Sequence, residues 1–166
     1  MPTFGRTSSE ELASCHDFMR ACAERAIAVV DFKVLCGHRV KDRQDHYFNT
    51  GRSKVQWPNS KHNSLPSMAF DFAPWPIDWG DTGTASERAK ARARFYFVQG
   101  VLMAMAHTIN RERVARGEAT VFLPRGGHDW DGNGIFTDQR FDDLGHFEVR
   151  QVAASDVPSD SGKSGG

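Results

Sequence analysis

Two histidines and one aspartate of this sequence are residue types that together can hold a catalytic metal ion. His62 is followed by Asp71 after a short interval, and His146 stands near the end of the chain. Two imidazoles and one carboxylate make a three-ligand zinc set that leaves the fourth position for water. Zinc in such a set lowers the pKa of water to about 7, which makes hydrolysis accessible at neutral pH. The alternative is a group of unrelated polar residues at loops and strand ends.

A zinc site that cleaves peptides also needs a base. The base takes a proton from water and returns it to the leaving amine. Asp143 stands shortly before His146, in the segment Asp142-Asp143-Leu144-Gly145-His146. Its carboxylate could therefore reach the same water from the chain just before the strand that carries His146.

The residues around these positions resemble a known family. The shared motifs run in the order Gly37-His38-Arg39, Gln44, Gly51-x-Ser53, Ser60-Lys61-His62, Ala69-Phe70-Asp71, Trp130 and Asp143-Leu144-Gly145-His146-Phe147-Glu148. This pattern looks like the superfamily of zinc D-alanyl-D-alanine carboxypeptidases and L-alanyl-D-glutamate endolysins, and most of all like its small phage endolysin-type members. The likeness extends from about Phe32 to Val149. One departure is a lengthened interval between His62 and Asp71, which we interpret as a loop variation.

The resemblance implies a role for each matching residue. His62, Asp71 and His146 would be the zinc ligands, and Asp143 would be the catalytic base. Arg39 would steady the substrate carbonyl and the developing oxyanion, a role that suits the fixed charge of a guanidinium group.

Three further residues match supporting positions of the family. They are Gln44, Ser53 and Ser60. Two of them have an ordinary alternative, since Gln44 could be a helix-surface amide and Ser53 a turn hydroxyl. Ser60 could orient the site through a hydrogen bond.

A second metal is suggested by the segment 129–137, which reads Asp-Trp-Asp-Gly-Asn-Gly-Ile-Phe-Thr. It matches the first nine positions of an EF-hand calcium loop. The candidate calcium ligands are Asp129, Asp131, Asn133, Ile135 and Thr137. Position 12 is Arg140 where the loop needs a bidentate glutamate, so Asp138 or Asp142 would have to substitute. The alternative is a turn whose side chains cap their own backbone. Some endolysins of the resembling type are regulated by calcium here, so a regulatory site is our second metal hypothesis.

The elements that must position these residues indicate an α+β fold. Capping boxes at Ser8-x-x-Glu11 and Thr84-x-x-Glu87 predict helices over about 8–26 and 84–116. Residues 40–48 predict a short polar helix and residues 49–66 a long loop. Strands are expected over 27–35, 67–72, 120–123 and 146–150. This order favours a small, mainly antiparallel sheet backed by helices. The resemblance implies a hedgehog/D,D-peptidase-like architecture with its zinc site at the sheet edge.

The bulk properties favour one globular domain. The chain has 166 residues, and its Lys+Arg and Asp+Glu counts are both 21. Without a basic excess we expect no nucleic-acid binding. We assign residues 1–152 to a peptidase domain and 153–166 to a flexible tail. The three cysteines are an odd number without C-x-x-C spacing, and we expect buried thiols.

We expect synthesis in the cytoplasm, because the N-terminus lacks a signal sequence, and action on the cell wall after release. We also expect a monomer without stable membrane association. The resulting prediction is a zinc metallopeptidase that hydrolyses an amide in peptidoglycan stem peptides, most of all the L-alanyl-D-glutamate bond. Two alternatives are a D,D-carboxypeptidase of the same fold and a zinc-stabilised wall-binding or signalling module without turnover. A third is an intracellular interaction protein with adventitious histidines.

Overall fold

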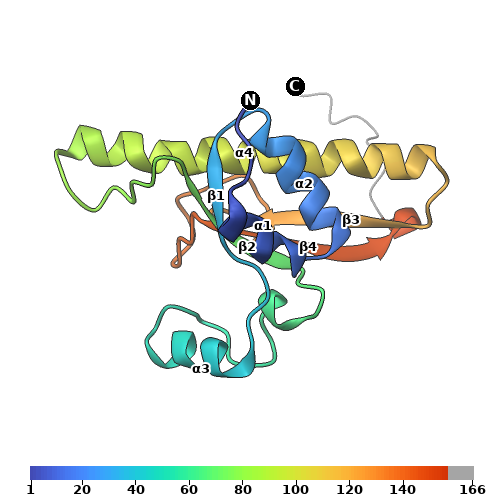
Figure 1. Cartoon of the computed structure of the whole chain (residues 1–166), viewed down its shortest axis with the longest axis horizontal. Coiled ribbons are helices and arrows are strands. Elements are labelled where there is room, and N and C mark those ends of the chain that lie inside the picture. Colours follow the sequence, from blue (N-terminus) through green and yellow to red (C-terminus); the bar gives the residue numbers. More distant parts are fainter. Residues whose placement is uncertain (157–166) are drawn as a thin grey trace.

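The computed structural model describes residues 1–156, in which helices and strands are mixed along the chain (Figure 1). The helices are α1 (Arg6–Ala13), α2 (Asp17–Ile27), α3 (Lys41–Asn49) and α4 (Ala85–Ala115). The strands are β1 (Phe32–Cys36), β2 (Ala69–Pro74), β3 (Thr120–Gly126) and β4 (His146–Ala153). Two short 3-10 helices are η1 (Lys61–Asn63) and η2 (Ala154–Asp156). The predicted α+β class is confirmed.

The four strands form one antiparallel sheet in the order β1-β2-β4-β3. Residues that face each other across an antiparallel pair point to the same side of the sheet. Phe70 faces Phe147 across β2 and β4, and Asp71 faces His146 one position along. The first pair is apolar and the second is polar. The sheet therefore has an apolar face and a polar face, and the polar face carries two of the predicted zinc ligands.

The apolar face of the sheet is covered by helices α1, α2 and α4, and the core lies between them. Its largest fully buried side chains include Phe32, Phe70, Phe72, Phe95 and Phe147. Helix α3 stands on the opposite side, so that the sheet lies between α3 and α4 (Figure 1). This arrangement leaves the polar face open toward the segment that carries α3 and η1.

The expected helix over residues 8–26 is wrong in its extent, because the chain forms two helices there. Helix α1 begins at Arg6, and its N-cap is Gly5 rather than Ser8. The helical hydrogen bonding stops at Cys15, which forms an isolated β-bridge with Ser67. The ring of His16 then caps α2 by accepting from Phe18 N–H at 3.1 Å. Tertiary contacts with the segment before β2 thus override the continuous helical pattern.

Ser8 has a different role from the predicted cap. Its hydroxyl accepts from Val34 N–H at 3.1 Å and lies 3.3 Å from Val34 O on β1. The side chain thereby occupies the open edge of the sheet, where a further strand would otherwise pair.

The other elements agree with expectation more closely. Helix α4 starts after Thr84 with the predicted capping box to Glu87, and it ends at Ala115. Helix α3 also lies where a short helix was expected. Strand β1 begins only at Phe32, because α2 continues to Ile27 and the N–H groups of Val29 and Val30 then form a turn on Ala26 O. Strands β3 and β4 extend beyond the predicted ranges, since their mutual pairing continues from Thr120 to Gly126.

The three cysteines are free and buried, as expected from the sequence. Burial raises the pKa of the Cys15 and Cys22 thiols to about 12. Among the described residues, no helix has both the length and the apolar character needed to cross a membrane. Most of the predicted flexible tail, residues 157–166, lies outside the described residues, and the division into domain and tail remains a prediction.

Candidate metal centre and active site

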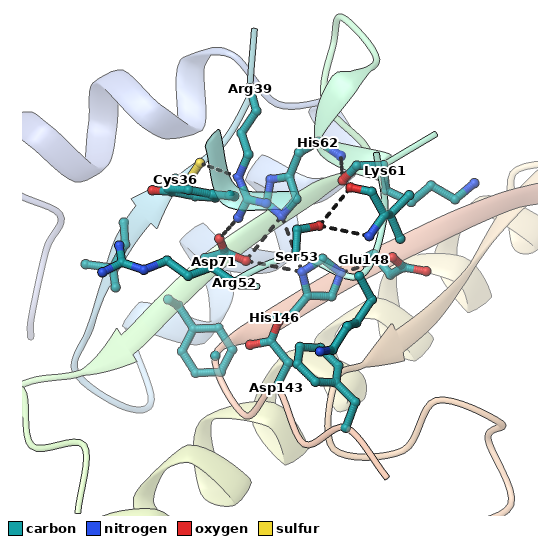
Figure 2. A pocket seen from close by; sticks show the side chains of 18 of the residues that line it. Cys36, Arg39, Arg52, Ser53, Lys61, His62, Asp71, Asp143, His146 and Glu148 are labelled. Atoms are coloured by element: carbon teal, nitrogen blue, oxygen red, sulfur yellow. Dashed lines mark hydrogen bonds and ion pairs between the residues drawn. The ribbon is translucent and has the colours of Figure 1, made fainter. Parts of the chain in front are cut away.

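The side chains of His62, Asp71 and His146 converge on one point of the polar face (Figure 2). His62 Nε2 lies 3.3 Å from His146 Nδ1. Asp71 Oδ1 lies 3.2 Å from each of these two nitrogens. The three residues come from η1, β2 and β4, so the fold brings together side chains that are up to 84 positions apart.

Each imidazole has one nitrogen that points away from the metal centre, and the partner of that nitrogen shows where the ring proton lies. The other nitrogen, which faces the centre, is then free to accept. His62 Nδ1 lies 2.7 Å from the carbonyl oxygen of Gly37, which can only accept, so this nitrogen carries the proton. His146 Nε2 lies 3.0 Å from Glu148 Oε2 and likewise donates to a carboxylate. With these tautomers, His62 Nε2, His146 Nδ1 and Asp71 Oδ1 all present lone pairs to the same point.

Three converging lone pairs need a positive charge between them. Zinc bonded to nitrogen and oxygen at about 2.0–2.1 Å in a tetrahedron separates its ligand atoms by about 3.3 Å. The observed separations of 3.2 and 3.3 Å match that value. The donor set therefore fits zinc in both chemistry and spacing.

The pKa shifts of the three residues also indicate a site that favours positive charge. Burial lowers the pKa of His62, although the Asp71 carboxylate partly opposes the shift. Burial alone would raise the pKa of Asp71, but His62, His146 and Arg39 hold it well below its usual value. Burial would lower the pKa of His146, yet its hydrogen bonds to Asp71 and Glu148 raise it to about 9. The Asp71 carboxylate thus stays ionised, and the raised pKa of His146 reflects the negative charge of the two carboxylates that contact it.

His62 is positioned by the short helix η1 and by the end of β1. The Ser60 side chain caps η1 and accepts from His62 N–H at 3.3 Å, while Asn63 completes a capping box. The lengthened interval to Asp71 is closed where Met68 N–H donates to Lys61 O at 3.1 Å. Ser60 therefore orients the backbone of the histidine.

Gly37 supplies the carbonyl that orients the His62 ring, and no larger residue fits there. A Cβ at this position would lie 2.3 Å from the Glu11 carbonyl oxygen and 2.4 Å from Ser14 Oγ. The end of α1 packs directly against this backbone. The glycine thus lets β1 continue past α1 and reach the metal centre.

Asp143 lies beside His146 in the segment that leads into β4 (Figure 2). Its carbonyl accepts from His146 N–H at 3.1 Å, and its N–H donates to Gly127 O at 2.9 Å. Burial raises the pKa of its carboxyl, and the Asp71 carboxylate adds to the increase, while His146 opposes it. A carboxyl with a raised pKa next to a metal centre is suited to accept and return a proton.

Arg39 is buried behind the metal centre. Its guanidinium group forms an ion pair with Asp71 Oδ2, and its Nε donates to Cys36 Sγ at 3.3 Å. It also borders the cavity above the metal centre, so it can hold Asp71 and face a substrate carbonyl.

Cys36 is a further side chain that a metal could reach, because its sulfur lies within 4.8 Å of ligand atoms of both His62 and Asp71. The Nδ1 of His146 lies 3.3 Å from His62 Nε2 and 3.2 Å from Asp71 Oδ1, the spacing that suits zinc. Burial raises the pKa of the Cys36 thiol, which disfavours the thiolate that binds zinc. We therefore prefer His146 as the third ligand.

Gln44 and Ser53 support the wall of the cavity. The Gln44 side chain is fully buried and donates to Ser53 Oγ at 2.9 Å and to the Val55 carbonyl. Its oxygen accepts from Asn63 at 3.4 Å. Gln44 therefore ties α3 to the 53–55 turn and to η1, and only Ser53 of these two borders the cavity.

A cavity of about 730 Å³ lies above the metal centre. One wall comes from the segment with α3 and η1, and the other includes Trp79, Trp130 and Phe141. A second cavity of about 430 Å³ lies toward β3 and α4. Both cavities are lined by Lys61, Arg125, Trp130 and Glu148, so they are neighbours and these four side chains stand between them.

The candidate calcium loop lies between β3 and β4 and has no flanking helices. The Asp129 carboxylate accepts from three backbone N–H groups, those of Gly132, Asn133 and Gly134, at 2.9–3.2 Å. The Asn133 amide donates to Asp131 at 2.9 Å and to Asp138 at 2.8 Å. The carboxylates thus gather around Asn133, and the loop satisfies them internally. Ile135 N–H donates to Asn133 Oδ1 at 2.6 Å, and within residues 1–156 the Thr137 side chain forms no hydrogen bond.

Two residues of the site received no role from the sequence. Glu148 follows His146 by two positions on β4, and this alternation alone places both side chains on the same face. Arg125 reaches Glu148 only through the pairing of β3 with β4, which the sequence does not reveal.

Comparisons with known proteins agree with this architecture. By sequence, the chain matches no model of a known protein family and no curated protein. By structure, its fold is similar to that of a solved endopeptidase. It resembles the crystal structure of the L-Ala D-Glu endopeptidase ChiX of Serratia marcescens, with a TM-score of 0.60 and 19% sequence identity. The likeness covers 89% of each chain. The fold implied by the resemblance to the endolysin-type peptidases is therefore confirmed.

Proposed function

We propose that the chain is a zinc metallopeptidase that hydrolyses the L-alanyl-D-glutamate bond of peptidoglycan stem peptides. The observation that carries the proposal is the convergence of three acceptor atoms, from His62, Asp71 and His146, at separations that suit zinc. The shared fold with an L-Ala D-Glu endopeptidase supports the choice of bond.

The chain's own residues account for the remaining chemistry. When bound, zinc would activate a water molecule and polarise the scissile carbonyl as a Lewis acid. Asp143 accepts a proton from the attacking water and returns it to the nitrogen of the leaving amine. The carbon–nitrogen bond breaks as that proton arrives, so the nitrogen leaves as a neutral amine and no further acid is needed. The carboxyl product keeps the oxygen of the water. Arg39 pairs with Asp71 and borders the cavity, where its fixed positive charge would stabilise the oxyanion.

The space around the metal centre favours an internal cut over removal of a terminal residue. The large cavity above the centre and its neighbour toward β3 leave room for a peptide to continue beyond the scissile bond. A carboxypeptidase instead needs a closed end with a cation for the terminal carboxylate. Arg52, Lys54 and Lys61 border the larger cavity, and within residues 1–156 none of them has an ion-pair partner. They complement carboxylates within a stem peptide and a terminal carboxylate alike, so these charges do not favour either activity.

The bond is tested by mass spectrometry of fragments released from purified cell walls. Cleavage by an endopeptidase would give new peptides with D-glutamate at their N-terminus. Release of free D-alanine alone would identify the D,D-carboxypeptidase alternative. Binding to the wall without any released fragment, in a protein that carries zinc, would identify the non-catalytic module.

Calcium at the 129–137 loop is a second, separate proposal. Asp129, Asp131, Asn133 and Asp138 lie close together, and a cation could replace the amide hydrogens of Asn133 between the carboxylates. Trp130 lies inside the loop, so its fluorescence should change as calcium binds. No change in fluorescence or in wall-lytic activity across millimolar calcium would contradict this proposal.

A further inference from the structure

His146 faces the metal centre with Nδ1 and not with Nε2. A set of hydrogen bonds and ring contacts around its imidazole favours this orientation. The opposite nitrogen, Nε2, donates to Glu148 Oε2 at 3.0 Å. Both residues lie on the polar face of β4 and are only 7% and 6% exposed. A buried carboxylate that can only accept holds the proton on Nε2 and leaves the lone pair of Nδ1 for the metal.

Glu148 is itself held in place by Arg125, its partner across the pair of strands β3 and β4. Arg125 Nε donates to Glu148 Oε1 at 2.9 Å, and Nη2 donates to the same oxygen. Glu148 thus gives one oxygen to the arginine and the other to the histidine. Neither oxygen can leave its partner without breaking a charge-assisted hydrogen bond, and the bond to His146 is buried.

Trp130 closes this set of contacts into a ring. Arg125 Nη1 donates to the Trp130 carbonyl at 3.1 Å, and its guanidinium group lies 5.3 Å from the centre of the indole ring. The indole in turn packs on the His146 imidazole, with ring centres 5.3 Å apart at an angle of 33°. His146 is therefore restrained at its edge by Glu148 and on its face by Trp130.

We propose that Glu148 and Arg125, with Trp130, are positioning residues that hold His146 in the orientation and tautomer required for metal binding. The proposal rests on the zinc site of the proposed function but not on its substrate. Because Trp130 belongs to the segment between β3 and β4, the same ring ties the placement of that segment to the geometry of the metal centre.

The direct test is the zinc affinity of Glu148→Ala, measured by competition with a chromogenic chelator. Loss of the partner should weaken zinc binding by about 10–100-fold. Glu148→Gln keeps an oxygen that can accept from Nε2, so it should restore much of the affinity. Arg150→Ala is the matched control, since Arg150 is the next residue on the same face of β4 and is exposed. Its zinc affinity should equal that of the unchanged protein.

A second readout separates orientation from a general loss of structure. In the zinc-loaded protein, nitrogen-15 NMR should find His146 protonated on Nε2 and metal-bound through Nδ1, and His62 with the reverse arrangement. Without zinc, and at a pH where the ring is neutral, His146 of Glu148→Ala should show a mixture of tautomers, whereas the unchanged protein should keep the proton on Nε2. If Glu148→Ala does not fold by circular dichroism, Arg125→Met provides the comparison, because it removes the support of Glu148 and leaves the carboxylate. The affinity of this variant for zinc should also fall.

The outcomes distinguish this inference from the proposed function. A folded Glu148→Ala or Arg125→Met protein with unchanged zinc affinity and an unchanged His146 tautomer would overturn the positioning role alone. Failure of the unchanged protein to bind zinc at all would instead overturn the proposed function, and the positioning role with it.

Discussion

At the scale of single residues, two carboxylates close to the metal centre are shifted in opposite directions. The cationic and imidazole neighbours of Asp71 hold its pKa well below the usual range, so it stays ionised, as the proposed zinc ligand must. Burial and the nearby Asp71 charge raise the pKa of Asp143. Two carboxyl groups with pKa values moved apart can divide the work, one binding a cation and the other transferring a proton.

Asp143→Asn tests this division of roles. An amide keeps the size of the side chain and cannot take up the proton, so wall-lytic activity should fall by about 10²–10⁴-fold. Zinc content should stay unchanged, because the three ligands remain. Asp142→Asn is the control, since Asp142 pairs with Arg92 on the surface. Wall lysis by Asp143→Asn at the unchanged rate would refute the assignment of the base.

The sequence could predict which residue types form the metal centre, but not the distances between them. His62, Asp71, His146 and Asp143 are recognisable because their motifs occur in a fixed order. The partner of His146 was within reach of prediction, because Glu148 alternates with it on one strand. Arg125 was not, since only the register of two strands that are distant in sequence brings it to Glu148. Cys36 was assigned only to a buried thiol, because its approach to the centre depends on a shift in the register of β1 against β2.

At the scale of elements, the agreement with the sequence depends on whether an element is decided locally. The boundaries of α4 follow from a capping box at Thr84 and from a run of apolar residues, and both are local signals. The break between α1 and α2 is decided by contacts of Cys15 and His16 with the residues before β2, which no local pattern contains. The segment between β3 and β4 has no periodicity, so its return to the metal centre could not be predicted.

The close approach of two loops at Gly127 gives a prediction at this scale. A Cβ at Gly127 would lie 2.1 Å from the carbonyl oxygen of Asp143, so Gly127→Ala must displace the segment that carries the base. A displacement of about 1 Å can cost about 100-fold in rate, and we expect a loss of activity up to that size with zinc retained.

Gly100→Ala is the matched control for Gly127→Ala. Gly100 lies in α4, and a Cβ there would meet nothing within 4 Å. Alanine should therefore raise the free energy of unfolding by about 0.5–1 kcal/mol without changing activity. Urea unfolding and wall lysis measure the two effects. Equal activities of the two variants would contradict the role given to the contact between Gly127 and Asp143.

At the scale of the whole molecule, the helices leave one face of the sheet free for the cavity above the metal centre. Side chains of α1 and α4 also cover the two edges of the sheet. Ser8 occupies the edge of β1, as described above. On β3, the Asn110 side chain accepts from Phe122 N–H at 3.0 Å and donates to Phe122 O at 2.6 Å. Edge strands with unpaired backbone groups tend to pair with other chains. These contacts therefore favour the expected monomer.

Asn110→Ala tests this function of the edge contacts. The variant leaves the N–H and C=O groups of Phe122 without their partner, which should cost about 1–3 kcal/mol in the free energy of unfolding. It should also increase association with concentration, as measured by size-exclusion chromatography with light scattering. Thr108→Ala is the control, because its hydroxyl bonds only within α4, to Ala104 O. An Asn110→Ala protein as stable and as monomeric as the control would contradict the role of Asn110 at the edge.

The central claim is that three acceptor atoms of this fold hold one zinc ion, and diffraction at the zinc absorption edge tests it most directly. In crystals of the zinc-loaded protein, the anomalous signal should give a single peak bonded to His62 Nε2, Asp71 Oδ1 and His146 Nδ1 at about 2.0–2.2 Å. Absence of the peak would contradict the claim. So would a zinc ion held by Cys36 with His62 and Asp71 while His146 turns away.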